Sequence, residues 1–156
     1  MTTLAAKGVI AEDHPLCLGL GGYPQAVYST LPAQKYAEDA DLILALGCSF
    51  AQQATLGWRP KPDKARLIQV DVDPAELHKN YSADLAILAD IKLFLQSFLE
   101  KAAEVMGQLR NGMGTSVAQE IRELKRQWLD AWKPRLTSEE IPMNPYRVMR
   151  RQQLTE

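Results

Sequence analysis

Three short, mainly apolar runs of residues limit what this 156-residue chain can fold into. They span residues 42–47 (LILALG), 67–72 (LIQVDV) and 85–89 (LAILA), and their lengths suit strands rather than helices. Strict alternation of apolar and polar residues is absent from them, which is typical of strands that are covered on both faces. The runs therefore predict a buried, parallel sheet.

Helical patterns lie between and after these runs. Residues 32–39 and 91–106 carry apolar side chains at helical spacing, and Asp90 stands where a helix cap would. The order Asp-Pro-Ala-Glu at 73–76 predicts a further helix directly after the second run. Strands that alternate with helices predict an α/β fold, with ligands bound at the carboxyl ends of the strands.

The last third of the chain predicts additional helices. Ser116 and Gln119 have the spacing of a capping box, and they predict a helix that continues to about Trp132 and ends at Pro134. Residues 137–145 have the composition of a linker, and another helix is expected to begin at Tyr146.

Composition excludes several classes of function. The formal net charge of −1 argues against binding to nucleic acid or to an anionic membrane surface. No apolar stretch is long enough for a transmembrane helix.

Cys17 and Cys48 are 31 positions apart, so we interpret them as reduced cysteines of a cytoplasmic protein. His14 and His78 have no partners at metal-ligand spacing, and we predict no metal site and no catalytic residue.

Two glycine-containing segments are candidate nucleotide contacts. Gly19, Gly21 and Gly22 lack the side chains that would keep a phosphate from backbone amides, although an ordinary glycine-rich turn is the stronger explanation for them. Gly47, Cys48 and Ser49 directly follow an apolar run, where a nucleotide could approach closely. The alternative there is a strand-to-loop turn with Cys48 as a small core residue.

Two carboxylates follow the second apolar run. Asp71 and Asp73 are alternate residues, so both could face a ligand, and one could accept hydrogen bonds from a ribose. For Asp73, capping of a helix is the stronger explanation. For Asp71, a ligand contact and a hydrogen bond within the loop remain equally good.

Six segments, taken in order, resemble the central domain of thiamine-diphosphate-dependent enzymes, the family that includes acetolactate synthases and related carboligases and decarboxylases. The segments are residues 6–15 (AKGVIAEDHP), 19–22 (GLGG), 40–47 (ADLILALG), 67–74 (LIQVDVDP), 76–80 (ELHKN) and 88–90 (LAD). The resemblance implies a Rossmann-like α/β domain of the DHS-like NAD/FAD-binding type. The enzymes of this family are transferases or lyases that act on 2-keto acids.

The resemblance also implies where catalysis resides. In this family, thiamine diphosphate and Mg²⁺ lie between a first and a third domain, with the activating glutamate in the first and a Gly-Asp-Gly metal motif in the third. Neither region is recognisable here, and no Gly-Asp-Gly occurs in the chain. We therefore expect a non-catalytic scaffolding fragment whose partners are the missing first and third domains. The alternative is a free-standing regulatory module that binds an adenine nucleotide or coenzyme A.

Some members of the family bind FAD or an ADP-containing nucleotide in the central domain. The matching positions here are the glycines at 19–22, residues 47–49 and residues 71–73. Flavin-binding synthases carry Gly-Ala-Arg-Phe-Asp-Asp-Arg where this chain has Gly-Cys-Ser-Phe-Ala-Gln-Gln from Gly47, so the arginine partners of a diphosphate are absent. This argues against FAD and leaves ADP or coenzyme A as the candidates.

The resemblance suggests three regions. They are a Rossmann-like central domain at 1–108, a helix and linker at 109–136, and the start of the diphosphate-binding domain at 137–156. From the resemblance we expect the chain to start after the family's usual first strand, helix and glycine-rich turn, near a second strand at Thr2–Leu4. An incomplete sheet leaves an unpaired edge, which predicts a homo-oligomer.

Overall fold

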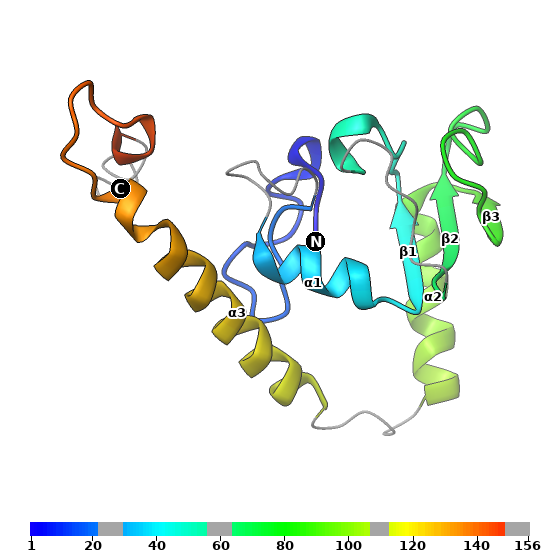
Figure 1. The fold of residues 1–156 in the computed structure, drawn as a ribbon. Helices are drawn as coiled ribbons and strands as arrows, with labels where there is room; N and C mark the ends of the chain where they lie inside the picture. Colours follow the sequence, from blue (N-terminus) through cyan, green and yellow to red (C-terminus); the bar gives the residue numbers. More distant parts are fainter. Residues whose placement is uncertain (22–29, 56–63, 107–112, 149–156) are drawn as a thin grey trace.

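The fold was obtained as a computed structural model that describes residues 1–21, 30–55, 64–106 and 113–148. Its helices and strands follow one another in an α/β order along the chain (Figure 1). They are η1 (Leu4–Ala6), α1 (Leu31–Asp39), β1 (Leu42–Leu46), η2 (Gln52–Ala54), β2 (Arg66–Asp71), β3 (Leu85–Leu88), α2 (Ile91–Met106) and α3 (Met113–Leu136).

The three apolar runs form the predicted parallel sheet. The strand order is β1-β2-β3, and both pairs of neighbours are parallel. Leu44 of β1 is level with Ile68 of β2, which is in turn level with Leu85 of β3. These residues share one face because residues level with each other in a ladder point to the same side. The α/β class and the parallel pairing are therefore confirmed.

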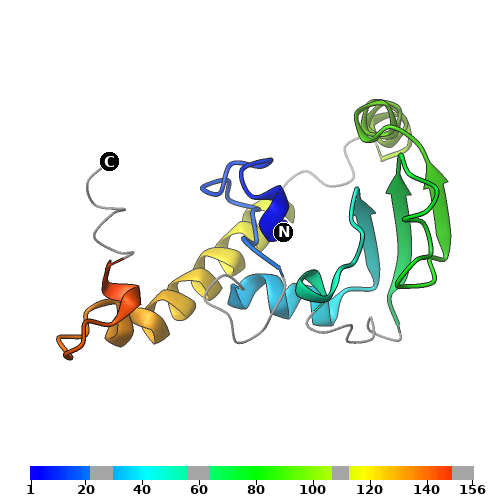
Figure 2. The ribbon, with the colours of Figure 1, turned by 90° about the horizontal axis from the view of Figure 1, so that it is seen from above.

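The two faces of the sheet are covered differently. On one face, Leu67 and Ala45 pack with Ala83, and Phe50 and Tyr81 close this core with an edge-to-face ring contact at 5.3 Å. On the other face lies α2, which runs behind the strands and past their lower ends (Figures 1 and 2). Val70, which alternates with Gln69 and Asp71, points to the α2 side and is completely buried.

The N-terminal segment differs from the expected strand at Thr2–Leu4. Thr2 makes a single parallel bridge to Leu20, in which its amide donates to Gly19 O at 3.1 Å and its carbonyl accepts from Gly21 N at 2.9 Å. The chain then turns into η1 at Leu4, so the ladder ends after one residue.

Two of the predicted helices form close to their expected bounds. The hydroxyl of Thr30 accepts a hydrogen bond from Ala33 N at the start of α1, and Asp90 Oδ1 accepts one from Leu93 N at 3.0 Å at the start of α2. These side chains satisfy amide groups that have no partner within the helix.

The helix predicted after Asp73 is wrong. Asp73 Oδ1 accepts from Ala75 N at 2.8 Å, and residues 74–78 form consecutive turns. His78 then adopts a left-handed backbone conformation with φ of 60°. The segment cannot continue as a helix, because its amides and carbonyls are used by β2 and by the turns themselves.

The long helix α3 begins earlier and ends later than predicted. It starts at Met113 rather than Ser116, and it includes Pro134 two residues before its end. A proline in the last turn removes only one helical hydrogen bond, so it does not have to stop the helix. The last residue of α3 is Leu136. The division of the chain into regions at 1–108, 109–136 and 137–156 stays a prediction.

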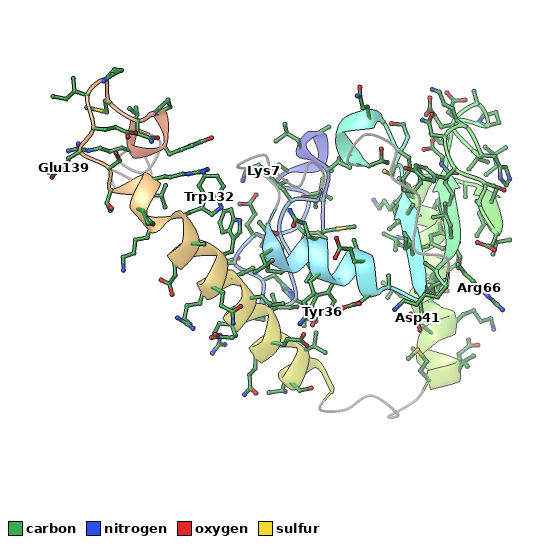
Figure 3. The ribbon with its side chains drawn as sticks, in the orientation of Figure 1. Lys7, Tyr36, Asp41, Arg66, Trp132 and Glu139 are labelled. Atoms are coloured by element: carbon green, nitrogen blue, oxygen red, sulfur yellow. The ribbon has the colours of Figure 1, made fainter. Side chains whose placement is uncertain are left out.

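Helix α3 packs on α1 and the N-terminal segment rather than on the sheet (Figures 1 and 2). Ile121 and Leu124 of α3 are buried in this contact. Glu120 accepts hydrogen bonds from Tyr36 Oη at 3.1 Å and from Lys35 Nζ at 3.3 Å, and Tyr36 lies between the two helices in Figure 3. Within the described ranges, no helix combines the length and the apolar character that a membrane span requires.

Candidate functional site

The carboxyl ends of β1 and β2 bring one group of the predicted site residues together. Gly47 follows β1, and its amide donates to Val70 O at 2.9 Å, which places Gly47 and Cys48 beside Asp71. Gly47 has φ of +58°, and a Cβ atom on it would come within 2.7 Å of Ile91 Cδ1 at the start of α2. The backbone conformation therefore favours glycine here, and a larger residue would have to displace the end of the Ile91 side chain.

The buried side chain of Gln69 fixes the loops that follow these two strands. Its Nε2 donates to Cys48 O at 3.2 Å and to Glu76 O at 2.9 Å, while its Oε1 accepts from His78 N at 3.0 Å. Gln69 is only 1% exposed, so these bonds form away from solvent. Both loops are thus held to the central strand by one amide group.

Further bonds connect the same loops nearer the surface. Asn80 Nδ2 donates to Ser49 O at 2.8 Å, which joins the β1 loop to the end of the β2 loop. His78 Nδ1 accepts from Ala83 N at 3.2 Å, so this imidazole has a structural role in the turn. The loop geometry is therefore set before any ligand binds.

Asp71 and Asp73 occupy different environments. Asp71 is 8% exposed, and its Oδ1 accepts from Asp73 N at 3.0 Å, which stabilises the turn after β2. Asp73 is exposed and uses Oδ1 to hold Ala75 N. Each carboxylate has a second oxygen with the capacity to accept another hydrogen bond, as from a ribose hydroxyl.

Cys48 lies in the same corner as a half-buried thiol. Burial raises its pKa, a hydrogen bond with the Phe50 backbone opposes this shift, and the negative charge of Asp71 adds to it. The thiol form is therefore favoured at neutral pH, which is the opposite of what a nucleophilic cysteine requires.

The other predicted glycines lie away from this corner. A Cβ atom on Gly19, whose φ is +85°, would come within 2.7 Å of the Thr30 side chain, and one on Gly21 would come within 3.0 Å of Met1 Sδ. These two positions allow tight packing of the N-terminal segment. Gly22 lies outside the described residues. The structure thus places Gly47, Cys48, Ser49, Asp71 and Asp73 at one end of the sheet and Gly19 and Gly21 elsewhere.

Sequence reasoning missed the residues that organise the site. Gln69 and Asn80 make its main side-chain contacts, and neither was a candidate. Gln69 did have a signal, because it is the one amide side chain inside an otherwise apolar and acidic run at 67–72. A polar side chain in a buried strand requires hydrogen-bond partners, which here are the strand-end loops.

The groups at this corner can form hydrogen bonds with a ligand. It offers carboxylate oxygens, backbone groups and the Ser49 hydroxyl, and the pKa of its thiol is raised. Across the part of the chain that the structure describes, no three His, Cys, Asp or Glu side chains come together to form a metal site.

Comparisons with known proteins identify the family. The profile described as "Thiamine pyrophosphate enzyme, central domain" matches residues 1–98. Among curated proteins, the probable acetolactate synthase large subunit of Methanococcus aeolicus is 29% identical over 154 residues, covering 96% of this chain and 24% of that protein. The corresponding protein of Methanocaldococcus jannaschii is 32% identical over 149 residues, covering 96% and 23%.

A plant relative is also similar over a shorter region. The probable acetolactate synthase 2 of rice chloroplasts is 41% identical over 96 residues, covering 61% of this chain and 14% of the rice protein. The chain thus spans about a quarter or less of the length of these relatives. Together with the parallel α/β sheet, the match over residues 1–98 shows that the chain belongs to the family of thiamine pyrophosphate enzyme central domains.

Proposed function

We propose that this chain is the non-catalytic central domain of a thiamine-diphosphate- and Mg²⁺-dependent carboligase or decarboxylase that acts on 2-keto acids. The match of residues 1–98 to the central-domain family carries the proposal. Relatives named as acetolactate synthases favour an acetolactate synthase-like parent. In such a parent, this chain connects a first and a third domain that hold the cofactor.

The geometry supports a scaffolding role. A scaffold needs a fixed shape, and the loops at the carboxyl end of the sheet are held by the buried Gln69 amide and by Asn80. A thiamine diphosphate site needs Mg²⁺ ligands for the diphosphate, and the described residues hold no cluster of three or more His, Cys, Asp or Glu side chains that could supply them. The cofactor would therefore be bound by the other domains.

The isolated chain tests this division of labour. We expect purified protein to form neither acetolactate nor carbon dioxide from pyruvate when thiamine diphosphate and Mg²⁺ are added. Turnover above a protein-free control would show that the chain has its own catalytic groups and would overturn the proposal.

We further propose that the corner formed by Gly47, Cys48, Ser49, Asp71 and Asp73 binds an adenine nucleotide or coenzyme A. The carboxylates of Asp71 and Asp73 lie at the carboxyl ends of parallel strands, where ribose-binding groups of α/β folds are found. Gly47 forms the turn that brings Cys48 and Ser49 beside these carboxylates. Ser49 and Gln53 stand where flavin-binding synthases carry two arginines, which disfavours FAD and its diphosphate.

Calorimetric titration and thermal unfolding with ADP, coenzyme A, NAD and FAD test this site. A ligand present at 100 times its dissociation constant stabilises the fold by about 2.7 kcal/mol, so binding of ADP or coenzyme A raises the melting temperature measurably. Asp73→Asn should weaken that shift. Asp90→Asn is the control, because Asp90 likewise accepts a backbone amide, that of Leu93 at the start of α2, but is not one of the five residues of this corner. A shift with none of the four ligands would leave only the scaffolding role.

Self-association is the remaining part of the proposal. The chain has an open three-stranded sheet among its described residues, and open edges favour pairing between chains. We therefore expect a homo-oligomer in addition to contacts with the first and third domains.

A further inference from the structure

The loop that follows β1 contains two residues with a left-handed backbone conformation. Gly47 has φ of +58°, and Phe50, three positions later, has φ of +50°. Glycine adopts this conformation without strain, whereas the Cβ atom of a phenylalanine crowds its own backbone there. Phe50 therefore forms a strained turn, which persists only where the surrounding contacts maintain it.

The ring of Phe50 makes the contacts that offset this strain. It packs against the core formed by Ala45, Leu67 and Ala83. It also meets the ring of Tyr81 edge to face, with centroids 5.3 Å apart and ring planes at 64°. Such a pair of rings is stabilising beyond the area that it buries. The strained turn is thus held through the aromatic side chain.

The backbone before this turn is held by two amide side chains. Gln69 Nε2 donates to Cys48 O at 3.2 Å, and Asn80 Nδ2 donates to Ser49 O at 2.8 Å. An extended chain would carry residues 48–50 about 10 Å beyond the sheet, at roughly 3.3 Å per residue. The turn at Phe50 instead returns the chain to the core, which keeps the carbonyl of Ser49 within reach of Asn80.

The polar and the aromatic contact are adjacent along both segments. Ser49 and Phe50 are consecutive in the loop after β1, and Asn80 and Tyr81 are consecutive in the connection between β2 and β3. The hydrogen bond requires the position that the ring contact gives to the backbone. Loss of the ring contact should therefore release the hydrogen bond as well.

We propose that Phe50 is the positioning residue of the nucleotide corner: its ring, held by Tyr81, maintains the turn that keeps Cys48 and Ser49 at the carboxyl end of the sheet. This inference rests on the proposed nucleotide site and identifies the residue that gives the first of its loops a fixed shape. Phe50 acts through its neighbours in the loop, because its own ring packs against the core.

Alkylation of the ligand-free chain by iodoacetamide tests this role, because Cys48 lies inside the loop. Cys17, which is 6% exposed in the N-terminal segment, is a reference within the same molecule. Phe50→Gly permits the turn but has no ring, so Cys48 should react about tenfold faster while the rate at Cys17 stays unchanged. Tyr81→Leu should have the same effect, because it removes the partner of the ring. Mass spectrometry of the two cysteine peptides gives the rates.

Conservative variants separate the ring contact from other causes. Phe50→Tyr and Tyr81→Phe keep both rings, so Cys48 should react in each at the rate of the unaltered chain. An unchanged rate at Cys48 in both Phe50→Gly and Tyr81→Leu would refute the positioning role. Equal acceleration at Cys17 would also refute it, because the two rings would then support the whole fold rather than this loop.

Calorimetric titration with ADP and coenzyme A tests the consequence for binding. The dissociation constant should rise about tenfold in Phe50→Gly and in Tyr81→Leu, and it should stay unchanged in Phe50→Tyr. Equal affinity in all these variants would refute the positioning role and leave the site itself standing. An unaltered chain that binds neither ligand would refute the nucleotide site, and the alkylation rates would still decide whether Phe50 positions the loop.

Discussion

The carboxyl end of the sheet and the contact between α1 and α3 are stabilised in different ways. At the sheet, one buried amide makes three hydrogen bonds to the backbone of two loops. Between the helices, two buried aliphatic residues are accompanied by hydrogen bonds at the exposed Glu120. Directional buried bonds fix a geometry, whereas a small apolar contact with an exposed ion pair allows two elements to separate.

This difference indicates that the carboxyl end of the sheet is more rigid than the contact between α1 and α3. A site at the strand ends requires loops of constant shape, and Gln69 supplies that constraint. Among the described residues, the main contact of α3 with another helix or strand is its contact with α1. We therefore expect α3 to detach at lower free energy than the loops open.

The largest effect is expected for Gln69→Leu. This variant leaves two carbonyls and one amide without partners in the interior, and it should lower the free energy of unfolding by about 4 kcal/mol, at roughly 1–1.5 kcal/mol per bond. Urea denaturation followed by circular dichroism measures the loss. Gln96→Leu on the exposed side of α2 is the control and should change stability by less than about 0.5 kcal/mol. Equal stabilities of the two variants would refute the role of Gln69.

Ile121→Ala should weaken the contact between α1 and α3 by about 3 kcal/mol, because Ile121 is 2% exposed and its loss leaves a cavity. Hydrogen exchange should show faster exchange throughout α3 and unchanged protection in β2. Leu129→Ala, at a 51% exposed position of the same helix, is the comparison variant and should have little effect. Equal loss of protection in β2 would show that α3 and the sheet unfold together.

A smaller effect is expected at high pH. Burial raises the pKa of Tyr36 above 10.0, and its hydrogen bond to Glu120 and the charge of that carboxylate act in the same direction. Because this pKa is raised in the folded chain, Tyr36 makes its full contribution to stability below pH 10. The contribution is lost as the pH rises through the pKa of Tyr36 in the folded chain. Fluorescence of Trp128 and Trp132 should report α3 detachment in that range. The step should vanish in Tyr36→Phe, and its persistence there would exclude Tyr36 as the cause.

The smallest effect concerns Cys48. Burial and Asp71 raise its pKa, so iodoacetamide should react slowly with the folded chain at neutral pH. Asp71→Asn keeps an acceptor for Asp73 N but removes the negative charge, which lowers the pKa and should speed alkylation a few-fold. Mass spectrometry of the modified peptide measures the rate. An unchanged or slower rate would contradict the assigned position of Asp71.

Most of the fold was predictable because local patterns determine it. The apolar runs at 42–47, 67–72 and 85–89 became β1, β2 and β3, and Asp90 caps α2 as expected. The segment at 73–76 shows the limit of such patterns. Its local sequence is that of a helix start, but the carbonyl of Glu76 and the amide of His78 bond to Gln69. A tertiary contact therefore replaced a local preference.

The candidate site was predictable only in part. The strand-end rule located Gly47, Cys48, Ser49, Asp71 and Asp73, because parallel strands end at one edge of a sheet. Gly19 and Gly21 lie elsewhere in the fold. The sequence could not reveal this, because a glycine that makes room for a ligand and a glycine that makes room for a threonine or methionine side chain look alike in a sequence. Gln69 and Asn80 were missed because their role depends on loops that are distant along the chain.

Domain replacement tests the central claim most directly. In the Methanocaldococcus jannaschii relative, the segment that matches over 149 residues is replaced by the corresponding part of this chain, and acetolactate formation from pyruvate is measured. If this chain is a non-catalytic central domain, the chimera should form acetolactate while the isolated chain forms none. A chimera that folds and assembles but has no activity, or an isolated chain that turns over pyruvate, would contradict the account.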